Sequence, residues 1–185
     1  MKSLQTIQKL SKLAKVLCKI VFICSIVGAS CCALGIITLA LIPGDLVVGD
    51  VTFHAMVEKS AEMSIGTCYG SMAVAIILCA GEAVISKIAE NYFKNELIAG
   101  TPFTFDGAKE LIRLGIINIC VSVGSAIIAS IVYEVFKLLF TGVEKLDLSN
   151  ATSIGLGITF IIVGVIFRYG AELNAQSQEK TEEIE

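Results

Sequence analysis

Few side chains in this sequence could do chemistry. Four of them lie near those ends of the apolar segments that would face the same side of a membrane. Glu82 lies within an apolar run, Asn118 lies about one helical turn inside another, and Arg113 and Arg168 border two of these runs. Charged groups inside apolar spans are costly, and they usually serve a function. The spacing suggests a polar cluster in which Glu82 pairs with Arg113 or Arg168, with Asn118 nearby. In the alternative, Glu82 reaches the lipid headgroups from the end of a shorter span.

Residues for catalysis or metal binding are scarce. His54 is the single histidine, and it falls in a predicted loop, whereas a zinc site needs three or four ligands at short spacing. The sequence contains no HExxH, no G-x-S-x-G, no P-loop and no G-x-G-x-x-G motif. We therefore expect no catalytic site, no cofactor and no metal site, and we expect a protein that is not an enzyme.

The cysteines do not form a disulfide pattern. Their number is odd, no two are spaced as CxxC, and all lie in or next to apolar runs. We expect them to pack as small apolar side chains; palmitoylation of Cys18 or a redox role is the alternative. The seven positions are 18, 24, 31, 32, 68, 79 and 120.

The composition indicates a membrane protein. Of the 185 residues 55% are apolar and 17% are charged, against about 45–50% and about 25% in soluble domains. The mean hydropathy is +0.82. An apolar run of about 20 residues matches the roughly 30 Å hydrocarbon core of a bilayer. Runs without Asp, Glu, Lys or Arg cover residues 20–44, 63–81, 114–133 and 148–167.

These runs predict an all-α membrane protein with four transmembrane helices in a bundle. A 20–169 membrane domain would contain spans at about 20–42, 64–86, 110–133 and 151–169. The segment 87–107 is mixed in charge, and the polar, acidic tail 170–185 is expected to be frayed. Gly66 and Gly70 form a GxxxG motif, which suits either close packing within the bundle or a dimer contact.

Residues 1–19 form a basic amphipathic helix in the prediction. Apolar residues recur at three- and four-residue spacing, and the lysines mostly fall on other faces. This pattern is typical of a helix at a membrane surface that turns its lysines toward anionic headgroups. A cytosolic extension of the first span is a compatible interpretation, because no helix breaker precedes Ile20. The lysines concerned are Lys9, Lys12, Lys15 and Lys19.

The distribution of basic residues predicts the orientation. An even number of spans places both termini on one side. That side would carry 11 of the 14 basic residues, and the other side would carry Lys59, Lys137 and Lys145. The positive-inside rule therefore places both termini in the cytoplasm, with the chain as a multi-pass protein of the cell (inner) membrane.

Two motifs carry a resemblance to a known family. The first is GTPFTFD at 100–106 followed by LIRLG at 111–115, and the second is IFRYGAEL at 166–173. Over roughly residues 12–175 the chain resembles the YoaS-like family of bacterial four-span membrane proteins, whose molecular function is not known. The resemblance implies no chemistry. It implies an association with a cytosolic helix-turn-helix regulator, since family members are often encoded beside one.

We expect a non-enzymatic regulatory or sensing partner of a cytosolic protein. The segments available to such a partner are the basic N-terminal helix, the 87–109 region and the acidic tail. The alternative is a small oligomeric transport or immunity-type membrane protein, which would act as a homo-oligomer. We expect no direct binding of nucleic acid.

Overall fold

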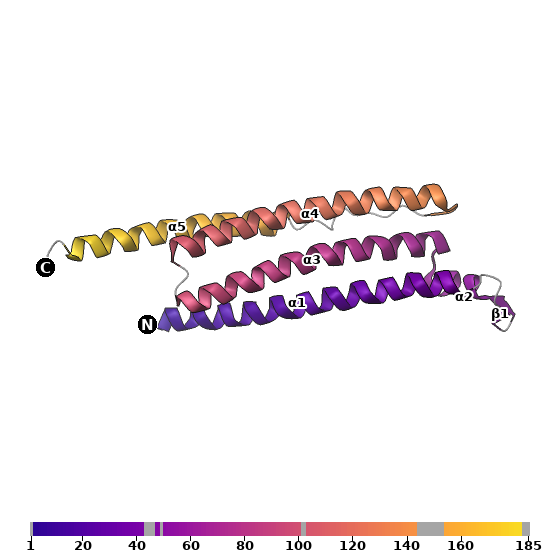
Figure 1. Ribbon diagram of the computed structural model, residues 1–185, viewed down its shortest axis with the longest axis horizontal. Coiled ribbons are helices and arrows are strands. Elements are labelled where there is room, and N and C mark those ends of the chain that lie inside the picture. Colours follow the sequence, from indigo (N-terminus) through magenta and orange to yellow (C-terminus); the bar gives the residue numbers. More distant parts are fainter. Residues whose placement is uncertain (1, 43–46, 49, 101–102, 144–153, 183–185) are drawn as a thin grey trace. The chain divides into compact units, whose positions relative to one another are not determined.

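The computed structural model of the chain describes residues 2–42, 47–48, 50–100, 103–143 and 154–182, and it is almost entirely helical (Figure 1). Four of its helices are long and apolar enough to cross a membrane, and they pack in a bundle, which confirms the predicted fold class. The helices are α1 (Lys2–Leu41), α2 (Phe53–Ala61), α3 (Ile65–Ala99), α4 (Phe105–Leu139) and α5 (Ile154–Glu182); the strands are β1 (Val47–Val48) and β2 (Val51–Thr52).

The long helices exceed the predicted spans. Helices α3 and α4 have 35 residues each, or about 52 Å at the usual rise, whereas the hydrocarbon core is about 30 Å thick. Residues 87–99, which lie in the predicted mixed-charge segment, continue α3 as helix. The tail was expected to be frayed, and this is wrong as far as Glu182, because α5 continues to that residue. Residues 2–19 run into span one without a break.

The chain divides into two compact units. The first contains the described parts of 1–23, 82–122 and 153–185, and the second contains those of 24–81 and 123–152. Segments of α1, α3 and α4 together with all of α5 therefore make up the first unit. We call the parts of these helices that lie outside the predicted spans the helical extension; its residues are 2–19, 87–99, 105–109 and 170–182.

The core of the first unit draws on all four long helices. Ala89, Tyr92, Leu111 and Leu114 form its buried centre, and the half-buried apolar side chains packed against them come from α1, α3 and α5. Two of these four centre residues, Ala89 and Tyr92, belong to the helical extension. The extension is thus held by an apolar core as well as by polar contacts.

Two hydrogen bonds join the N-terminal segment to α3 and to Gly100, the residue directly after it. The Gln8 side chain donates to the carbonyl of Gly100 at 3.2 Å, and the Ser11 hydroxyl donates to the Glu96 carboxylate at 3.0 Å. Ser11 is buried, while Leu10 on the other side of the helix is 65% exposed. Residues 2–19 therefore extend span one as a helix whose Gln8 and Ser11 side chains bond to Gly100 and to α3, while Lys9, Lys12 and Lys19 remain exposed.

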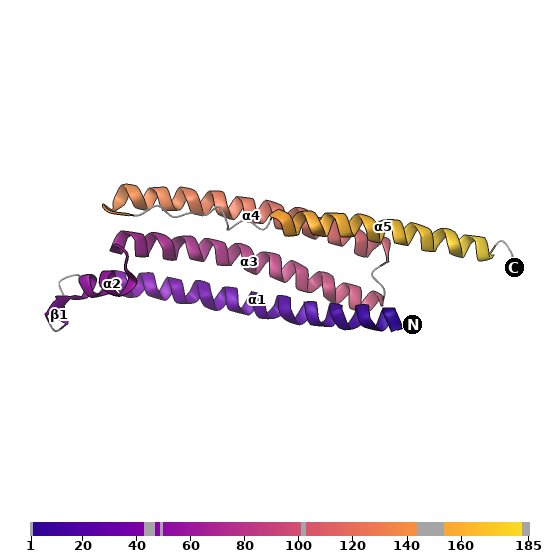
Figure 2. The same cartoon turned by 180° about the vertical axis from the view of Figure 1, so that it is seen from behind.

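Glycines let α4 and α5 approach to backbone contact in the first unit. A Cβ at Gly115 of α4 would lie 2.7 Å from the carbonyl oxygen of Gly157, and one at Gly164 of α5 would lie 3.2 Å from the carbonyl oxygen of Ala108. These pairings make the two helices antiparallel, and α5 runs along the first part of α4 in both views (Figures 1 and 2).

In the second unit, the GxxxG motif packs inside the bundle. A Cβ at Gly66 would meet Phe140 and Val143, which follow α4, and one at Gly70 would meet Tyr133 of α4. This is the packing interpretation of the motif, because both glycines pack against side chains of the same chain. The predicted loop that holds His54 contains a short hairpin of β1 and β2 followed by α2.

Candidate functional site

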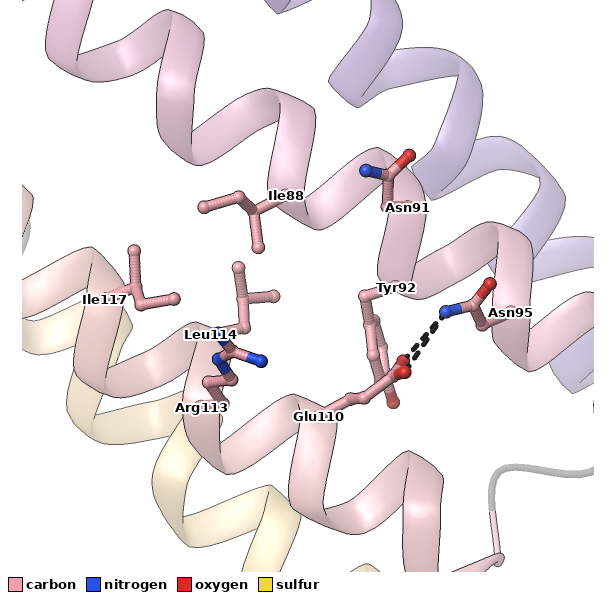
Figure 3. Close-up of a pocket in the computed structure, with 8 residues that line it drawn as sticks. All are labelled: Ile88, Asn91, Tyr92, Asn95, Glu110, Arg113, Leu114 and Ile117. Carbon is pink, nitrogen blue, oxygen red and sulfur yellow. Dashed lines mark hydrogen bonds between the residues drawn. The ribbon is translucent and has the colours of Figure 1, made fainter.

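A cavity of about 270 Å³ lies between α3 and α4 in the first unit (Figure 3). We call it the α3–α4 cavity. On α3 its lining residues are spaced by three and four, which places them along one face of the helix, and the α4 residues facing them are spaced in the same way. Those lining residues are Ile88, Asn91, Tyr92, Asn95, Glu110, Arg113, Leu114 and Ile117.

The lining changes from polar to apolar along the helix axes. Helix α3 ends and α4 begins at the connection after Ala99, so Asn95 and Glu110 lie at the end of the cavity nearest this connection. The Asn95 amide donates to both carboxylate oxygens of Glu110, at 3.1 and 3.2 Å, and joins the two helices there. Ile88 and Ile117 lie at the opposite, apolar end (Figure 3).

Two opposite charges at the cavity are left without a charged partner. Arg113 is exposed and makes no hydrogen bond or ion pair with any described residue. Glu110 accepts hydrogen bonds from the neutral Asn95 amide, so no cation balances its charge among the described residues. The two side chains are spaced i, i+3, which brings their Cβ atoms to about 5–6 Å.

Tyr92 forms a buried wall of the cavity. Its side chain is 4% exposed, and in Figure 3 its ring passes close to Glu110. Tyr92 lies beyond the predicted span 64–86, and burial together with Glu96 and Glu110 raises the pKa of its phenol. The ring therefore stays neutral at physiological pH, and it packs as an apolar surface next to the charged pair.

A second cavity of about 480 Å³ lies between the start of α4 and α5. Its lining residues are Phe105, Asp106, Lys109, Ile112 and Arg168. The Arg168 guanidinium donates from Nε to the Glu172 carboxylate of its own helix at 3.3 Å. Its charge is therefore partly satisfied locally, in contrast to that of Arg113.

The structure does not assemble the predicted cluster of Glu82, Arg113, Asn118 and Arg168. Glu82 is exposed on α3, and no ion pair joins it to either arginine among the described residues. The two arginines line different cavities. Asn118 is 1% exposed and lies against Gly157 of α5.

Of the residues that line the α3–α4 cavity, the sequence singled out only Arg113; its polar neighbours Asn91, Asn95 and Glu110 and the buried Tyr92 were not predicted as part of a site. They lie at or beyond the ends of the predicted spans, where hydropathy gives no signal. A periodic signal was present, however. Ile88, Tyr92 and Asn95 follow one another at four and three residues, the spacing of one helical face.

No described group of three or more His, Cys, Asp or Glu side chains is placed to hold a metal ion. His54 lies on α2, where its Nε2 is buried without a hydrogen-bond partner in the described part of the chain. One imidazole nitrogen does not make a metal centre.

No family model matches the chain, and neither the curated proteins nor the solved structures contain a match. The YoaS-like resemblance therefore stays a prediction.

Proposed function

We propose that the chain is a non-enzymatic, multi-pass protein of the bacterial inner membrane whose helical extension lies in the cytoplasm and binds a cytosolic protein, which it regulates or senses. The observation that carries this proposal is the extension itself. Four helices continue past their apolar spans, and in the extension Cys18 of α1 packs against the core to which Ala89 and Tyr92 of α3 belong.

A membrane anchor alone would not require this packing. Ordering each residue costs roughly 1–2 kcal/mol of backbone entropy, so an extension without a role would gain little by staying folded. Here the extension contains two buried core residues, Ala89 and Tyr92, and the specific bond from Ser11 to Glu96. A surface that is already folded suits recognition of another folded protein, because it loses less entropy on binding than a segment that must fold first.

The charge of the extension indicates the partner's chemistry. Lys9, Lys12 and Lys19 are exposed on α1, and Lys94 is exposed on α3. Lysines at a membrane surface attract anionic headgroups, and those that project from the extension attract an acidic protein surface and speed its association. We propose an acidic surface on a cytosolic protein. A helix-turn-helix regulator, which the YoaS-like resemblance implies, is the first partner to test.

A cross-linked pull-down from membranes, read by mass spectrometry, tests this proposal. The test variant carries Lys9→Glu and Lys12→Glu, both on exposed positions of α1. The matched control carries Lys59→Glu, an exposed lysine of α2 in the second unit. We expect one cytosolic protein to be retained by the wild type and the control and lost with the test variant.

Retention of the same proteins by all three forms would contradict the proposal. So would the absence of any cytosolic protein specific to the wild type. If the purified chain then proved to be an oligomer whose Glu82→Gln variant changes membrane permeability, the transport alternative would replace it.

A further inference from the structure

We infer that the α3–α4 cavity binds a phosphate diester that carries a neighbouring primary ammonium, the headgroup chemistry of an ethanolamine phospholipid. This site goes beyond the proposed binding of a cytosolic protein. It uses α3 residues of the helical extension, from Ile88 to Asn95, and α4 residues at the start of predicted span three, from Glu110 to Ile117.

The cavity lies at the level where charge gives way to apolar sequence. Arg113 is the last charged residue before the charge-free run 114–133 of α4. On α3 the cavity residues begin at Ile88, directly after Lys87 and beyond the predicted span. The bilayer changes from hydrocarbon to headgroups at this level, so lipid headgroups are present at high local concentration.

The polarity of the cavity has the direction of an amphiphile. Its polar end, at Asn95 and Glu110, is nearest the α3–α4 connection, and its apolar end, at Ile88 and Ile117, points into the spans. A phospholipid in the same leaflet places its headgroup and its first acyl carbons in the same order. Ile88 and Ile117 are half-buried, so an acyl chain passing over them stays in contact with the surrounding lipid.

The charges match a zwitterion with both ends recognised. The Arg113 guanidinium has all its donors free among the described residues, and guanidinium binds phosphate oxygens in bidentate geometry. The Glu110 carboxylate, fixed by Asn95, lies one turn away, where it would accept hydrogen bonds from an ammonium two carbons from the phosphate. A choline headgroup cannot donate such bonds.

The volume favours a headgroup over a larger ligand. Sites for drug-sized molecules enclose about 300–1,000 Å³, and this cavity holds about 270 Å³. That space accepts a headgroup with its first acyl carbons and leaves the chains outside, in the bilayer.

Native mass spectrometry of the full chain, with equal amounts of phosphatidylethanolamine, phosphatidylcholine and phosphatidylglycerol, tests the inference. We expect the wild type to retain phosphatidylethanolamine about tenfold better than the other two, the discrimination that one charge-assisted hydrogen bond gives. Arg113→Gln should lower retention of all three lipids, and Glu110→Gln should bring the ethanolamine and choline lipids to equal retention. Lys109→Gln is the matched control, since Lys109 is exposed beside Glu110 but lines the other cavity.

Competition with soluble phosphoethanolamine distinguishes a lipid headgroup from a soluble phosphate ester as the ligand of the cavity. If the ligand is a lipid, the soluble compound competes only weakly with it; equal competition would assign the site to a soluble phosphate ester instead. Equal retention of all three lipids by the wild type would overturn the inference. So would wild-type retention by Arg113→Gln. Arg113→Lys keeps the charge but loses the bidentate geometry, so it should retain all three lipids less well than the wild type. Wild-type retention by Arg113→Lys would overturn the inference if Arg113→Gln fails to fold.

Discussion

The close contact between α4 and α5 can be tested with two glycine-to-alanine variants, one that changes packing and helix propensity together and one that changes helix propensity alone. Gly115 and Gly124 lie on the same helix, nine positions apart, and each would be changed to alanine. A Cβ at Gly115 would lie 2.7 Å from the Gly157 carbonyl oxygen and 3.0 Å from the Ile161 nitrogen. Because both are backbone atoms, the helices must move apart. A Cβ at Gly124 meets nothing within 4 Å.

The two variants share one effect and differ in another. Replacing a helical glycine by alanine gains roughly 0.5–1 kcal/mol from chain entropy in either case. At Gly115 the added methyl group also overpacks the contact, which typically costs about 1–3 kcal/mol. We therefore expect Gly124→Ala to be slightly more stable than the wild type. Gly115→Ala should be less stable than Gly124→Ala by about 1–3 kcal/mol, roughly a 5- to 150-fold change in the unfolding equilibrium.

Unfolding by SDS in mixed micelles, followed by far-UV circular dichroism, measures this difference. The reciprocal pair lies on α5: Gly157→Ala places its Cβ 2.9 Å from the Gly115 carbonyl oxygen, whereas Gly155→Ala meets nothing within 4 Å. The two comparisons should agree in sign. Gly115→Ala proving as stable as Gly124→Ala would refute backbone contact between α4 and α5.

Two further predictions concern the helical extension. Burial raises the pKa of Glu96, which lies beyond span two, and the hydrogen bond from Ser11 partly offsets this. The folded state therefore favours the protonated carboxyl of Glu96. The free energy of unfolding should fall as the pH rises from below the ordinary glutamate pKa to above the raised pKa. Thermal unfolding across this pH range should show a flatter profile for Glu96→Gln than for the wild type. For orientation, cysteines introduced at Lys9 or Gln176 in a cysteine-free background should react with an impermeant maleimide only in inside-out vesicles, and one at Lys59 only in spheroplasts; the opposite labelling would reverse the topology.

The number and type of the long helices followed from the sequence because the signal is direct. A charge-free run of the right length has few structures open to it in a membrane, since every backbone group must be bonded within the helix. The sequence did not predict where these helices begin and end. Residues 87–99 mix charged and apolar side chains and 170–182 are mostly polar, so the ends of these helices depend on contacts with neighbouring segments and not on hydropathy. Ser11 and Glu96, for example, are 85 residues apart.

The candidate site was the least predictable part, and Arg113 shows why. Sequence reasoning identified it as a notable charge and looked for its partner in Glu82, since both belong to the same ends of their spans. Pairing depends on which faces of the helices meet, and a sequence does not give this rotation. In the structure the nearest acid in sequence, Glu110, lies on the same face of α4 and lines the same cavity.

The two proposals become one mechanism only if their binding free energies are coupled. The α3–α4 cavity and the helical extension share Tyr92, which lines the first and belongs to the core of the second. A lipid in the cavity would therefore stabilise the surface that the cytosolic protein binds. Linkage requires that the lipid and the protein change each other's affinity by the same factor. Arg113→Gln should then weaken retention of the protein, and adding the protein should raise retention of phosphatidylethanolamine equally. No effect in either direction would leave two independent sites on one chain.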